Sequence, residues 1–233
     1  MFINLSYPLS ESTPFYSKLP PPRLEKRFDL EQGDTCNSYY LTTSNHAGTH
    51  VDGPNHFDVN GRKIADYSLA ELVFTRVALL DIRVEQDELI HSKHLTGCSQ
   101  CRKDCDLLMI RTGFGKYRFD ADTYINHNPG FSAEAATFLM DYFPALKALG
   151  VDFASIAAMT HMEEGCEAHR IFLGCGAYNK RPALLIEDVR LPETLPNMER
   201  VFLVPWFVEG IDSAPCTLFT EIADNACGVA VIE

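Results

Sequence analysis

The sequence predicts an α/β protein with a β-rich core and a few flanking helices, and three observations support this class. Short runs rich in β-branched and apolar residues recur along the 233 residues, and each is typical of a strand. Segments with helical character lie between some of these runs, which indicates a mixture of helices and strands. The composition, 46% hydrophobic and 22% charged, is that of an ordinary globular protein. We therefore expect a single domain over residues 1–233.

The strand-like runs should build the core. They combine β-branched, aromatic and other apolar residues, as strands in a packed sheet do. The runs are residues 37–43, 73–82, 106–112, 151–158, 183–189, 201–208 and 228–233. The proline-rich residues 18–28 are instead predicted to form an extended, mobile loop.

Three segments are predicted to be helical. The clearest is residues 132–150, where Ser132 suits an N-cap and Gly150 suits a C-terminal stop. Pro144 should kink this helix or split it in two, because proline cannot donate the backbone hydrogen bond of a helix interior. The other two candidates are residues 85–95 and 163–173.

The chain is acidic, with a formal net charge of -12 and a pI near 5.1. This charge repels phosphate backbones, and no run of Lys and Arg offsets it locally, so nucleic acid is not an expected partner. The amino terminus lacks a basic segment followed by an apolar one, and no apolar run approaches the roughly 18 residues of a membrane helix. We expect a cytoplasmic protein with no membrane partner.

Eight cysteines are scattered through the chain, and free thiols in a reducing compartment explain them best. The one tight cluster is Cys98, Cys101 and Cys105, with His91 and His94 just upstream. A structural zinc site is an alternative there, because Cys-x-x-Cys is a common half-site. A second half-site at the usual spacing is absent from the sequence.

Residues 45–57, "NHAGTHVDGPNHF", concentrate three histidines and an aspartate. A helix is disfavoured by Gly48 and by the Asp-Gly-Pro that follows, so an extended strand is expected. Side chains of a strand alternate with a period of two, so His46, His50 and Asp52 should share one face. Gly48 would lie on that face and leave space for a cation.

Two imidazoles and a carboxylate suit a divalent ion such as zinc, and they also accept manganese or iron. Three ligands leave positions open for water and for further ligands, which a catalytic site needs. His56 follows a Gly-Pro turn that breaks the alternation, so it is better interpreted as a proton-transfer group. The alternative is a set of histidines satisfied by hydrogen bonds on a polar surface.

The stretch "HAGTHVDGPNHF" resembles the His-x-Gly-Thr-His-x-Asp-x-Pro-x-His signature of the metal-dependent cyclase family, which includes bacterial kynurenine formamidases and isatin hydrolases. The similarity continues through residues 107–114, 128–139 and 203–215. The resemblance implies a swivelling β/β/α-type fold. It also implies a metal-dependent hydrolase of amides, lactams or related acyl compounds that uses a metal-activated water.

The resemblance further implies roles for single residues. His46, His50 and Asp52 would be metal ligands, and His56 the general acid/base. The family completes its site with a downstream His and Glu, which map to His169 and Glu187. Four other residues compete for these two roles: His161, Glu163, Glu164 and Glu167. The cofactor would be zinc or manganese, with one or two ions per chain.

The family pattern also bears on the substrate and on assembly. Tyr16 stands where the formamidases have a tryptophan thought to contact the substrate, and Phe15 precedes it. Both can present a ring face, so a small and possibly aromatic substrate is expected. The resemblance implies a homodimer or homotetramer.

Three other functions remain open at this point. A hydrolase with Cys166 or Cys175 as nucleophile and His169 as base would need these side chains within hydrogen-bond reach. A lactone hydrolase or cyclase of the same family is a second possibility. A non-catalytic metal-binding or ligand-binding protein on the same scaffold is the third, although such a protein would not need His56.

Overall fold

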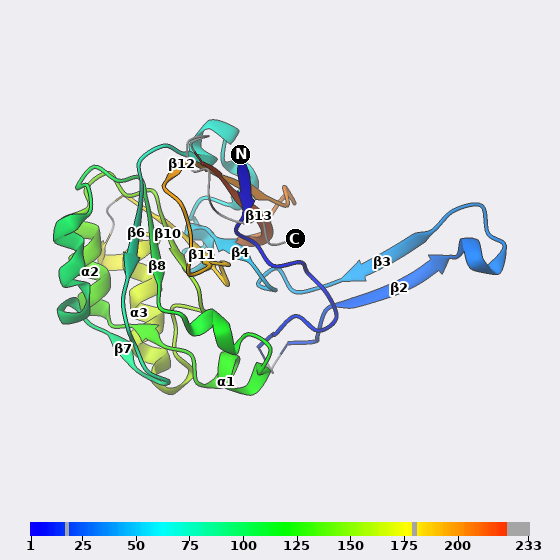
Figure 1. Cartoon of the computed structure of the whole chain (residues 1–233), viewed down its shortest axis with the longest axis horizontal. Helices are drawn as coiled ribbons and strands as arrows, with labels where there is room; N and C mark the ends of the chain where they lie inside the picture. Colours follow the sequence, from blue (N-terminus) through cyan, green and yellow to red (C-terminus); the bar gives the residue numbers. More distant parts are fainter. Residues whose placement is uncertain (17–18, 179–180, 223–233) are drawn as a thin grey trace.

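The computed structural model describes residues 1–16, 19–178 and 181–222 (Figure 1). Within them, nine strands form one sheet. Eight of these strands follow the order β5-β12-β13-β4-β11-β10-β8-β6, and the ninth, β1, also pairs with β13. The strands are β1 (Phe2–Asn4), β4 (His50–Asp52), β5 (Val73–Phe74), β6 (Val77–Asp81), β8 (Leu107–Arg111), β10 (Ala148–Val151), β11 (Leu184–Glu187), β12 (Met198–Pro205) and β13 (Ser213–Ile222). The strand expected at residues 228–233 lies outside the described residues.

The sheet curls until its two ends approach each other. β5 and β6 stand at opposite ends of the strand order, yet only two residues separate them in the chain. The sheet is therefore barrel-like and nearly closed. β6, β8, β10 and β11 run parallel to one another, while β4, β5, β12 and β13 join through antiparallel pairs. The expected α/β class with a β-rich core is confirmed.

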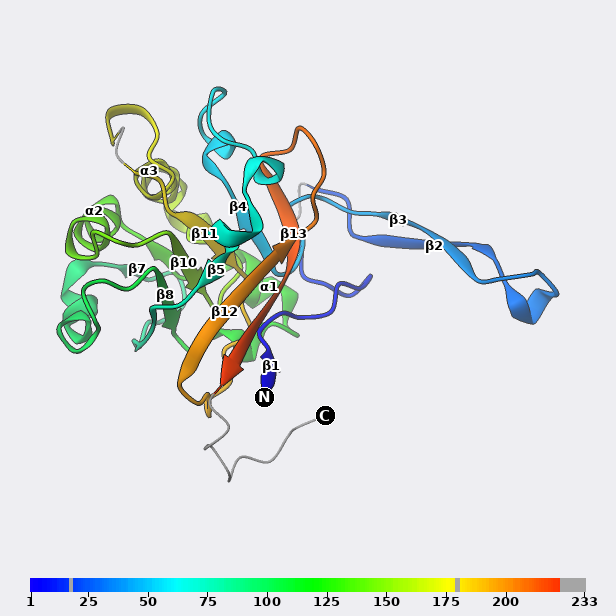
Figure 2. The ribbon, with the colours of Figure 1, turned by 90° about the horizontal axis from the view of Figure 1, so that it is seen from above.

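Helices cover one face of the parallel strands (Figures 1 and 2). They are α2 (Ala133–Tyr142) and α3 (Met162–Phe172), while α1 (Ala121–Asn126) lies below these strands in Figure 1. Along β8, Leu108 and Ile110 pack into the core beneath the helices, and the alternate residues Leu107 and Met109 pack inside the curled sheet. Because both faces of β8 are buried, its sequence reads as a continuous apolar run. None of the described helices is long and apolar enough to cross a membrane.

The helix predicted over residues 132–150 is correct at its start and wrong at its end. Ser132 caps α2 by accepting a hydrogen bond from the backbone N–H of Ala135 at 3.1 Å. The helix ends at Tyr142, two residues before Pro144. Gly150 lies in β10 and is not a helix stop. A Cβ there would meet the sulfur of Met109 at 2.3 Å, so glycine permits the close pairing of β10 with β8.

The other two helix predictions differ in outcome. The helix predicted at residues 163–173 is confirmed as α3, which ends one residue earlier, at Phe172. The helix predicted at residues 85–95 is wrong: β7 (Leu89–Ile90) pairs there with β9 (Gly130–Phe131). The remaining helical segments are 3₁₀ helices, η1 (Leu30–Gln32), η2 (Pro54–His56), η3 (Ile64–Asp66), η4 (Leu69–Leu72), η5 (Ser92–Gln100), η6 (Phe114–Tyr117), η7 (Met159–His161) and η8 (Gly176–Tyr178).

Most of the predicted strands are present, with different boundaries. The strand expected at residues 151–158 is wrong beyond Val151, because the chain leaves the sheet there as a loop that faces β11. Residues 18–28 were expected to be a loop, but residues 23–28 form β2 (Arg23–Phe28). This strand pairs with β3 (Ser38–Thr42) in a hairpin that stands apart from the body (Figure 1).

Candidate functional site

The centre of the site is β4, which lies between β11 and β13. The strand register places His50 opposite Glu187 of β11, and Asp52 opposite Ser213 of β13. Paired residues of antiparallel strands project on the same face. Residues more than 130 positions apart in the sequence are thereby brought to one point on the sheet.

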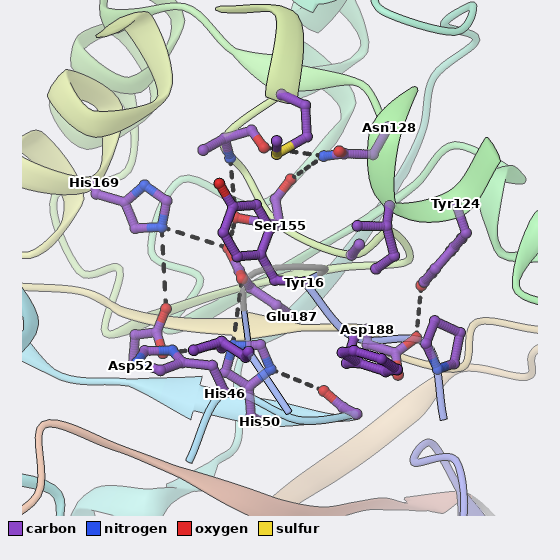
Figure 3. Close-up of a pocket in the computed structure, with 18 of the residues that line it drawn as sticks. Tyr16, His46, His50, Asp52, Tyr124, Asn128, Ser155, His169, Glu187 and Asp188 are labelled. Atoms are coloured by element: carbon purple, nitrogen blue, oxygen red, sulfur yellow. Dashed lines mark hydrogen bonds and ion pairs between the residues drawn. The ribbon is translucent and has the colours of Figure 1, made fainter. Parts of the chain in front are cut away.

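The expected strand over residues 46–52 is shorter than predicted. Gly48 has a φ of +65°, a left-handed conformation that favours glycine, so the chain turns there and β4 begins at His50. His46 therefore approaches from a turn, yet its Nδ1 lies 3.1 Å from Oδ1 of Asp52. Nε2 of His50 lies 3.6 Å from the same oxygen. The three residues converge as the sequence predicted, by a different backbone path (Figure 3).

The downstream pair joins this cluster from two other elements. His169 comes from α3 and Glu187 from β11, and both side chains are buried. Nε2 of His169 lies 3.6 Å from Oε1 of Glu187 and 4.0 Å from Oδ2 of Asp52. Nε2 of His50 lies 3.4 Å from Oε2 of Glu187. A cavity opens beside this cluster, and none of the four competing residues lines it: His161, Glu163, Glu164 and Glu167.

Each inward-facing histidine is held through its other ring nitrogen. Nδ1 of His50 donates to the carbonyl of Gly48 at 2.8 Å, and Nδ1 of His169 donates to the carbonyl of Gly165 at 2.8 Å. Nε2 of His46 lies 2.9 Å from the hydroxyl of Ser213. These contacts fix the ring orientations and direct the free nitrogens at Asp52 and Glu187, as outer partners of histidine ligands do in metal sites.

A buried oxygen in the cluster has room for a cation. Oδ1 of Asp52 is buried and accepts no well-directed hydrogen bond from any described residue, although Nδ1 of His46 lies 3.1 Å away. Such an orphaned carboxylate oxygen is costly unless a positive charge compensates it. The cluster contains two groups of three residues whose ligand atoms lie within 4.8 Å of one another inside each group. Asp52 belongs to both groups. The first group adds His46 and His56, and the second adds His50 and Glu187. The residues present therefore fit a divalent ion.

The electrostatics of the cluster favour its charged forms. Burial opposes ionisation of Glu187, but hydrogen bonds from His169 and His50 lower the pKa of this carboxyl well below its usual range. Burial opposes protonation of His46, but Asp212 and Asp52 raise the pKa of this imidazole to about 10. The carboxylates thus remain ionised in the interior, where a cation would be stabilised.

Asp212 is a site residue that sequence reasoning missed. Its Oδ2 accepts a hydrogen bond from Nδ1 of His56 at 2.7 Å and lies 3.3 Å from Nε2 of His46. The amide of Asn45 donates to its Oδ1 at 2.8 Å. No local pattern marks Asp212, because strand pairing across the sheet brings it to the motif.

A second missed feature holds Glu187. The loop after β10 donates two hydrogen bonds to its Oε1, from the hydroxyl of Ser155 at 3.1 Å and from the backbone N–H of Ile156 at 2.7 Å. The amide of Asn128 in turn donates to the backbone carbonyl of Ser155 at 2.8 Å. This loop was expected to be a strand, so its role could not be predicted.

A cavity of about 330 Å³ opens over the cluster. Phe15 and His56 line it, and so does Tyr16, which Figure 3 labels. Most of the remaining wall is apolar and comes from Leu19, Phe57, Ile125, Met159 and Met162. The arrangement of a mainly apolar cavity with a few converging polar groups is typical of a small-molecule site.

The cysteines do not form an alternative centre. Cys175 is buried, and its thiol contacts the carbonyl of Pro54 at 3.6 Å. Cys166 lines the cavity, but no hydrogen bond or ion pair joins it to His169 in the described structure. Burial raises the pKa of Cys98 and Cys105 to about 12, and their cluster with Cys101 supplies no close ligand group among the described residues.

Comparison with known proteins identifies the family of this chain. A family model described as "Putative cyclase" matches residues 3–158, more than half of the chain. The kynurenine formamidase of Bacillus thuringiensis subsp. konkukian is 27% identical over 220 residues, which cover 92% of this chain and 94% of that protein.

Solved structures share the fold. An isatin hydrolase bound to the product analogue thioisatinate superimposes with a TM-score of 0.75 at 17% identity, covering 94% of this chain and 90% of that one. A potential metal-dependent hydrolase with cyclase activity gives a TM-score of 0.70 at 20% identity, covering 94% and 98%. At these identities the likeness concerns the fold.

Proposed function

Because the chain belongs to the cyclase family, we propose that it is a metal-dependent hydrolase that cleaves an amide, a lactam or a related acyl bond of a small substrate. The observation that carries this proposal is the buried, orphaned Oδ1 of Asp52 among inward-facing histidines, beside a cavity large enough for a small molecule. The family relationship supports the reaction class, and the site's chemistry supports the metal that this reaction class uses.

We assign the metal-holding role to His46, His50, Asp52, His169 and Glu187. Their imidazole nitrogens and carboxylate oxygens suit zinc or manganese, with one or two ions per chain. When bound, a divalent ion supplies Lewis acidity, which makes water a stronger acid and polarises a carbonyl group. The hydrogen bonds from Ser155 and Ile156 hold Glu187 in place for this role.

His56 is proposed as the general acid/base. Asp212 can only accept a hydrogen bond as a carboxylate, so Nδ1 of His56 carries the proton between them. Nε2 is then left free to take a proton from the attacking water and to deliver it to the leaving nitrogen or oxygen. Asp212 would also stabilise the imidazolium that forms in between, as the orienting carboxylate of a catalytic triad does.

The substrate class follows from the cavity wall and from the relatives. Phe15, Tyr16 and Phe57 line the cavity beside the cluster. Isatin hydrolases and kynurenine formamidases are among the similar proteins. We propose a small aromatic or heteroaromatic acyl compound, with Phe15 and Tyr16 contacting its ring. The homodimer or homotetramer implied by the family is part of the same proposal.

The decisive experiment is a turnover screen with N-formyl aromatic amines, isatins, lactams and lactones, run on metal-free protein with and without added zinc or manganese. Metal-dependent hydrolysis of an amide or lactam supports the proposal. Turnover of lactones alone would identify a lactone hydrolase instead. Metal binding without turnover of any class would favour a binding protein on the same scaffold.

A further inference from the structure

Asn128 lies between α1 and β9 and is only 1% exposed. Its side-chain nitrogen, Nδ2, donates to three backbone carbonyls, those of Pro129 at 2.8 Å, Ser155 at 2.8 Å and Ala157 at 3.1 Å. Two of these carbonyls belong to the β10 loop, which we define as residues 152–158, between β10 and η7. The side chain of Asn128 therefore fastens this loop to the chain that precedes β9.

The three carbonyls determine which way the amide of Asn128 points. A backbone carbonyl accepts hydrogen bonds and cannot donate them, so the group that faces all three must be the NH₂ group. The opposite orientation would place an oxygen against three other oxygens with no hydrogen between them. The hydrogen-bond network thus assigns the amide, as it should for any asparagine. The second polar atom of the side chain, Oδ1, is directed away from the three carbonyls.

Oδ1 of Asn128 opens into the cavity over the metal-binding cluster. It accepts no hydrogen bond from any described residue. In the part of the chain that the structure describes, Oδ1 of Asp52 is the one buried side-chain atom without a well-directed hydrogen bond, so Oδ1 of Asn128 is not sealed in the interior. The residue lines the cavity, beside Ser155 in Figure 3, and its other atoms are buried. The cavity is therefore where this oxygen emerges.

Neighbouring polar groups of the cavity wall already have partners inside the protein. The hydroxyl of Ser155 donates to Oε1 of Glu187 at 3.1 Å. The hydroxyl of Tyr124 donates to Oδ1 of Asp188 at 2.6 Å. Oδ1 of Asn128 differs from these groups because both of its lone pairs remain available. A hydrogen-bond donor on a bound molecule would find an acceptor there.

We propose that Asn128 is a specificity residue, whose Oδ1 accepts a hydrogen bond from an N–H group of the substrate. Water satisfies such an oxygen while the cavity is empty, but a substrate that displaces the water must supply a donor or leave the oxygen unpaired. Amides and lactams can carry an N–H group, whereas esters and lactones have at the same position an oxygen that only accepts. The choice among acyl compounds rests on the proposed function, while the hydrogen bond itself does not.

The expected selectivity is substantial. A site that hydrogen-bonds a polar group of its substrate rejects the analogue that lacks this group, because the protein's own polar atom is then left without a partner. An unpaired acceptor out of contact with water costs enough free energy to change kcat/KM by about 10- to 100-fold. Asn128 should therefore favour a lactam or an anilide over the lactone or ester of the same shape.

Asn128 also has a supporting role, which the test must separate from substrate recognition. The β10 loop that it fastens donates two hydrogen bonds to Glu187, from Ser155 and from Ile156. Asn128→Ala should loosen this support and lower the turnover of every substrate. Such a general loss cancels when one enzyme is compared on two substrates of the same shape, so the ratio of their kcat/KM values reports on Oδ1 alone.

The experiment measures kcat/KM of the metal-loaded protein on two matched pairs, isatin with benzofuran-2,3-dione and formanilide with phenyl formate. Each pair exchanges N–H for oxygen, and rates are corrected for spontaneous hydrolysis. The preference for the N–H member should be about 10- to 100-fold smaller in Asn128→Ala than in the wild type. Because both proteins meet the same substrates, the intrinsic difference in reactivity between amide and ester also cancels.

Ser155→Ala is the matched control. It removes a donor to Glu187 and leaves Oδ1 of Asn128 in place, so it should lower kcat/KM on both members of a pair by the same factor. The preference for the N–H member should then equal that of the wild type. If Asn128→Ala also keeps the wild-type preference, Asn128 only supports the β10 loop and the proposal is overturned.

A binding measurement makes the proposal independent of turnover. Indole and benzofuran have the same shape, differ by N–H and oxygen, and contain no bond that a hydrolase of this class would cleave. In calorimetric titrations, the preference of the wild type for indole should be at least about fivefold larger than that of Asn128→Ala. Far-UV circular dichroism verifies that the variants are folded. No preference for indole in the wild type, or an equal preference in both proteins, would overturn the proposal.

The two measurements also distinguish this proposal from the proposed function. Turnover with unchanged preferences in Asn128→Ala would leave the hydrolase standing and remove the role of Asn128. A lost preference for indole in Asn128→Ala, without turnover of any acyl compound by the wild type, would instead retain the N–H site and remove the hydrolase.

Discussion

Nδ1 of His56 lies 2.7 Å from Oδ2 of Asp212, a residue 156 positions further along the chain. His56 lies on the 3₁₀ turn after β4, and Asp212 directly precedes β13, the strand that pairs with β4. The backbone N–H of Gly53 donates to the carbonyl of Asp212 at 2.9 Å, which fixes the two segments against each other. The contact is therefore built into the sheet, and it sets the tautomer of His56.

Asp212→Asn should lower kcat by about 10- to 100-fold with little change in KM, because the imidazolium of His56 loses its counter-charge while the cavity keeps its shape. Asp212→Glu should restore part of the loss. Steady-state kinetics with the best substrate of the turnover screen, together with metal content by elemental analysis, measure the effect.

Ser213→Ala is the matched control for this prediction. It removes the hydroxyl beside Nε2 of His46 and leaves the contact between His56 and Asp212 intact. Its expected effect is weaker metal binding. If Asp212→Asn loses metal as readily as Ser213→Ala and regains full kcat at saturating metal, Asp212 supports His46 and not His56.

His50→Ala and His56→Ala should separate a metal ligand from a proton-transfer group. His50 points Nε2 into the buried cluster, so His50→Ala should strip the ion and abolish hydrolysis together. His56 contacts Asp212 through one nitrogen, so His56→Ala should keep most of the metal while turnover falls by about 100-fold or more. Elemental analysis and initial rates of both variants provide the measurement.

The contrary outcome is specific. His56 belongs to one of the two close ligand groups, with His46 and Asp52. Equal loss of metal in both variants would therefore make His56 a ligand, and another group would have to move the proton.

Much of the site could be predicted from the local sequence, because several of its residues lie in one short motif. The helix that carries His169, α3, could also be predicted from its sequence. The convergence of His46, His50 and Asp52 could be predicted from spacing, although the path through Gly48 could not. Glu187 was recognisable as a charge in an apolar strand. Asp212 and Ser155 were not, since neither has a local signature and each depends on which strands become neighbours.

The same limit applies to the fold. Pro144 indicated where α2 would end, but whether the chain then re-enters a sheet depends on the partner strands β8 and β11. The local sequence around Gly150 is compatible with a helix end and also with a small residue in a tightly packed strand. The strand explains the glycine in the structure, because a Cβ at this position would meet the sulfur of Met109 on the neighbouring strand.

Arg118→Met should destabilise the fold more than any exposed ion-pair variant. Arg118 makes a bidentate ion pair with Asp188 at 2.8 and 2.9 Å, and both side chains are buried. Asp188 has a φ of +53° and also accepts from the hydroxyl of Tyr124 at 2.6 Å. Removing Arg118 leaves this carboxylate buried without its counter-charge, so the free energy of unfolding should fall by about 3 to 5 kcal/mol.

Chemical denaturation with Arg170→Met as control tests this prediction. The partner of Arg170 is Glu167, and both side chains are exposed, so its loss should cost at most about 1 kcal/mol. Similar losses for the two variants would show that the buried pair contributes no more than a surface pair.

Cys166→Ser should retain nearly full activity. Cys166 lines the cavity, but no hydrogen bond joins its thiol to His169 in the described structure, and the imidazole of His169 is held by Gly165 and directed at Glu187. A nucleophilic cysteine needs a base within hydrogen-bond reach. Loss of activity on alkylation of wild type, with Cys166→Ser inactive and fully metal-loaded, would contradict the metal-dependent mechanism.

Removal of the metal should lower thermal stability, and Asp52→Asn should abolish this dependence. An ion bound only by the folded protein stabilises it by mass action, by about 2.7 kcal/mol when its concentration is 100 times its dissociation constant. Asp52 belongs to both close ligand groups, so neither group can hold an ion well without its carboxylate. Thermal melts of wild type with chelator, zinc or manganese should therefore differ by several degrees, while those of Asp52→Asn coincide. If the melting temperature of the wild type were the same with chelator, zinc and manganese, the cluster would bind no metal. The buried Oδ1 of Asp52 would then need another partner.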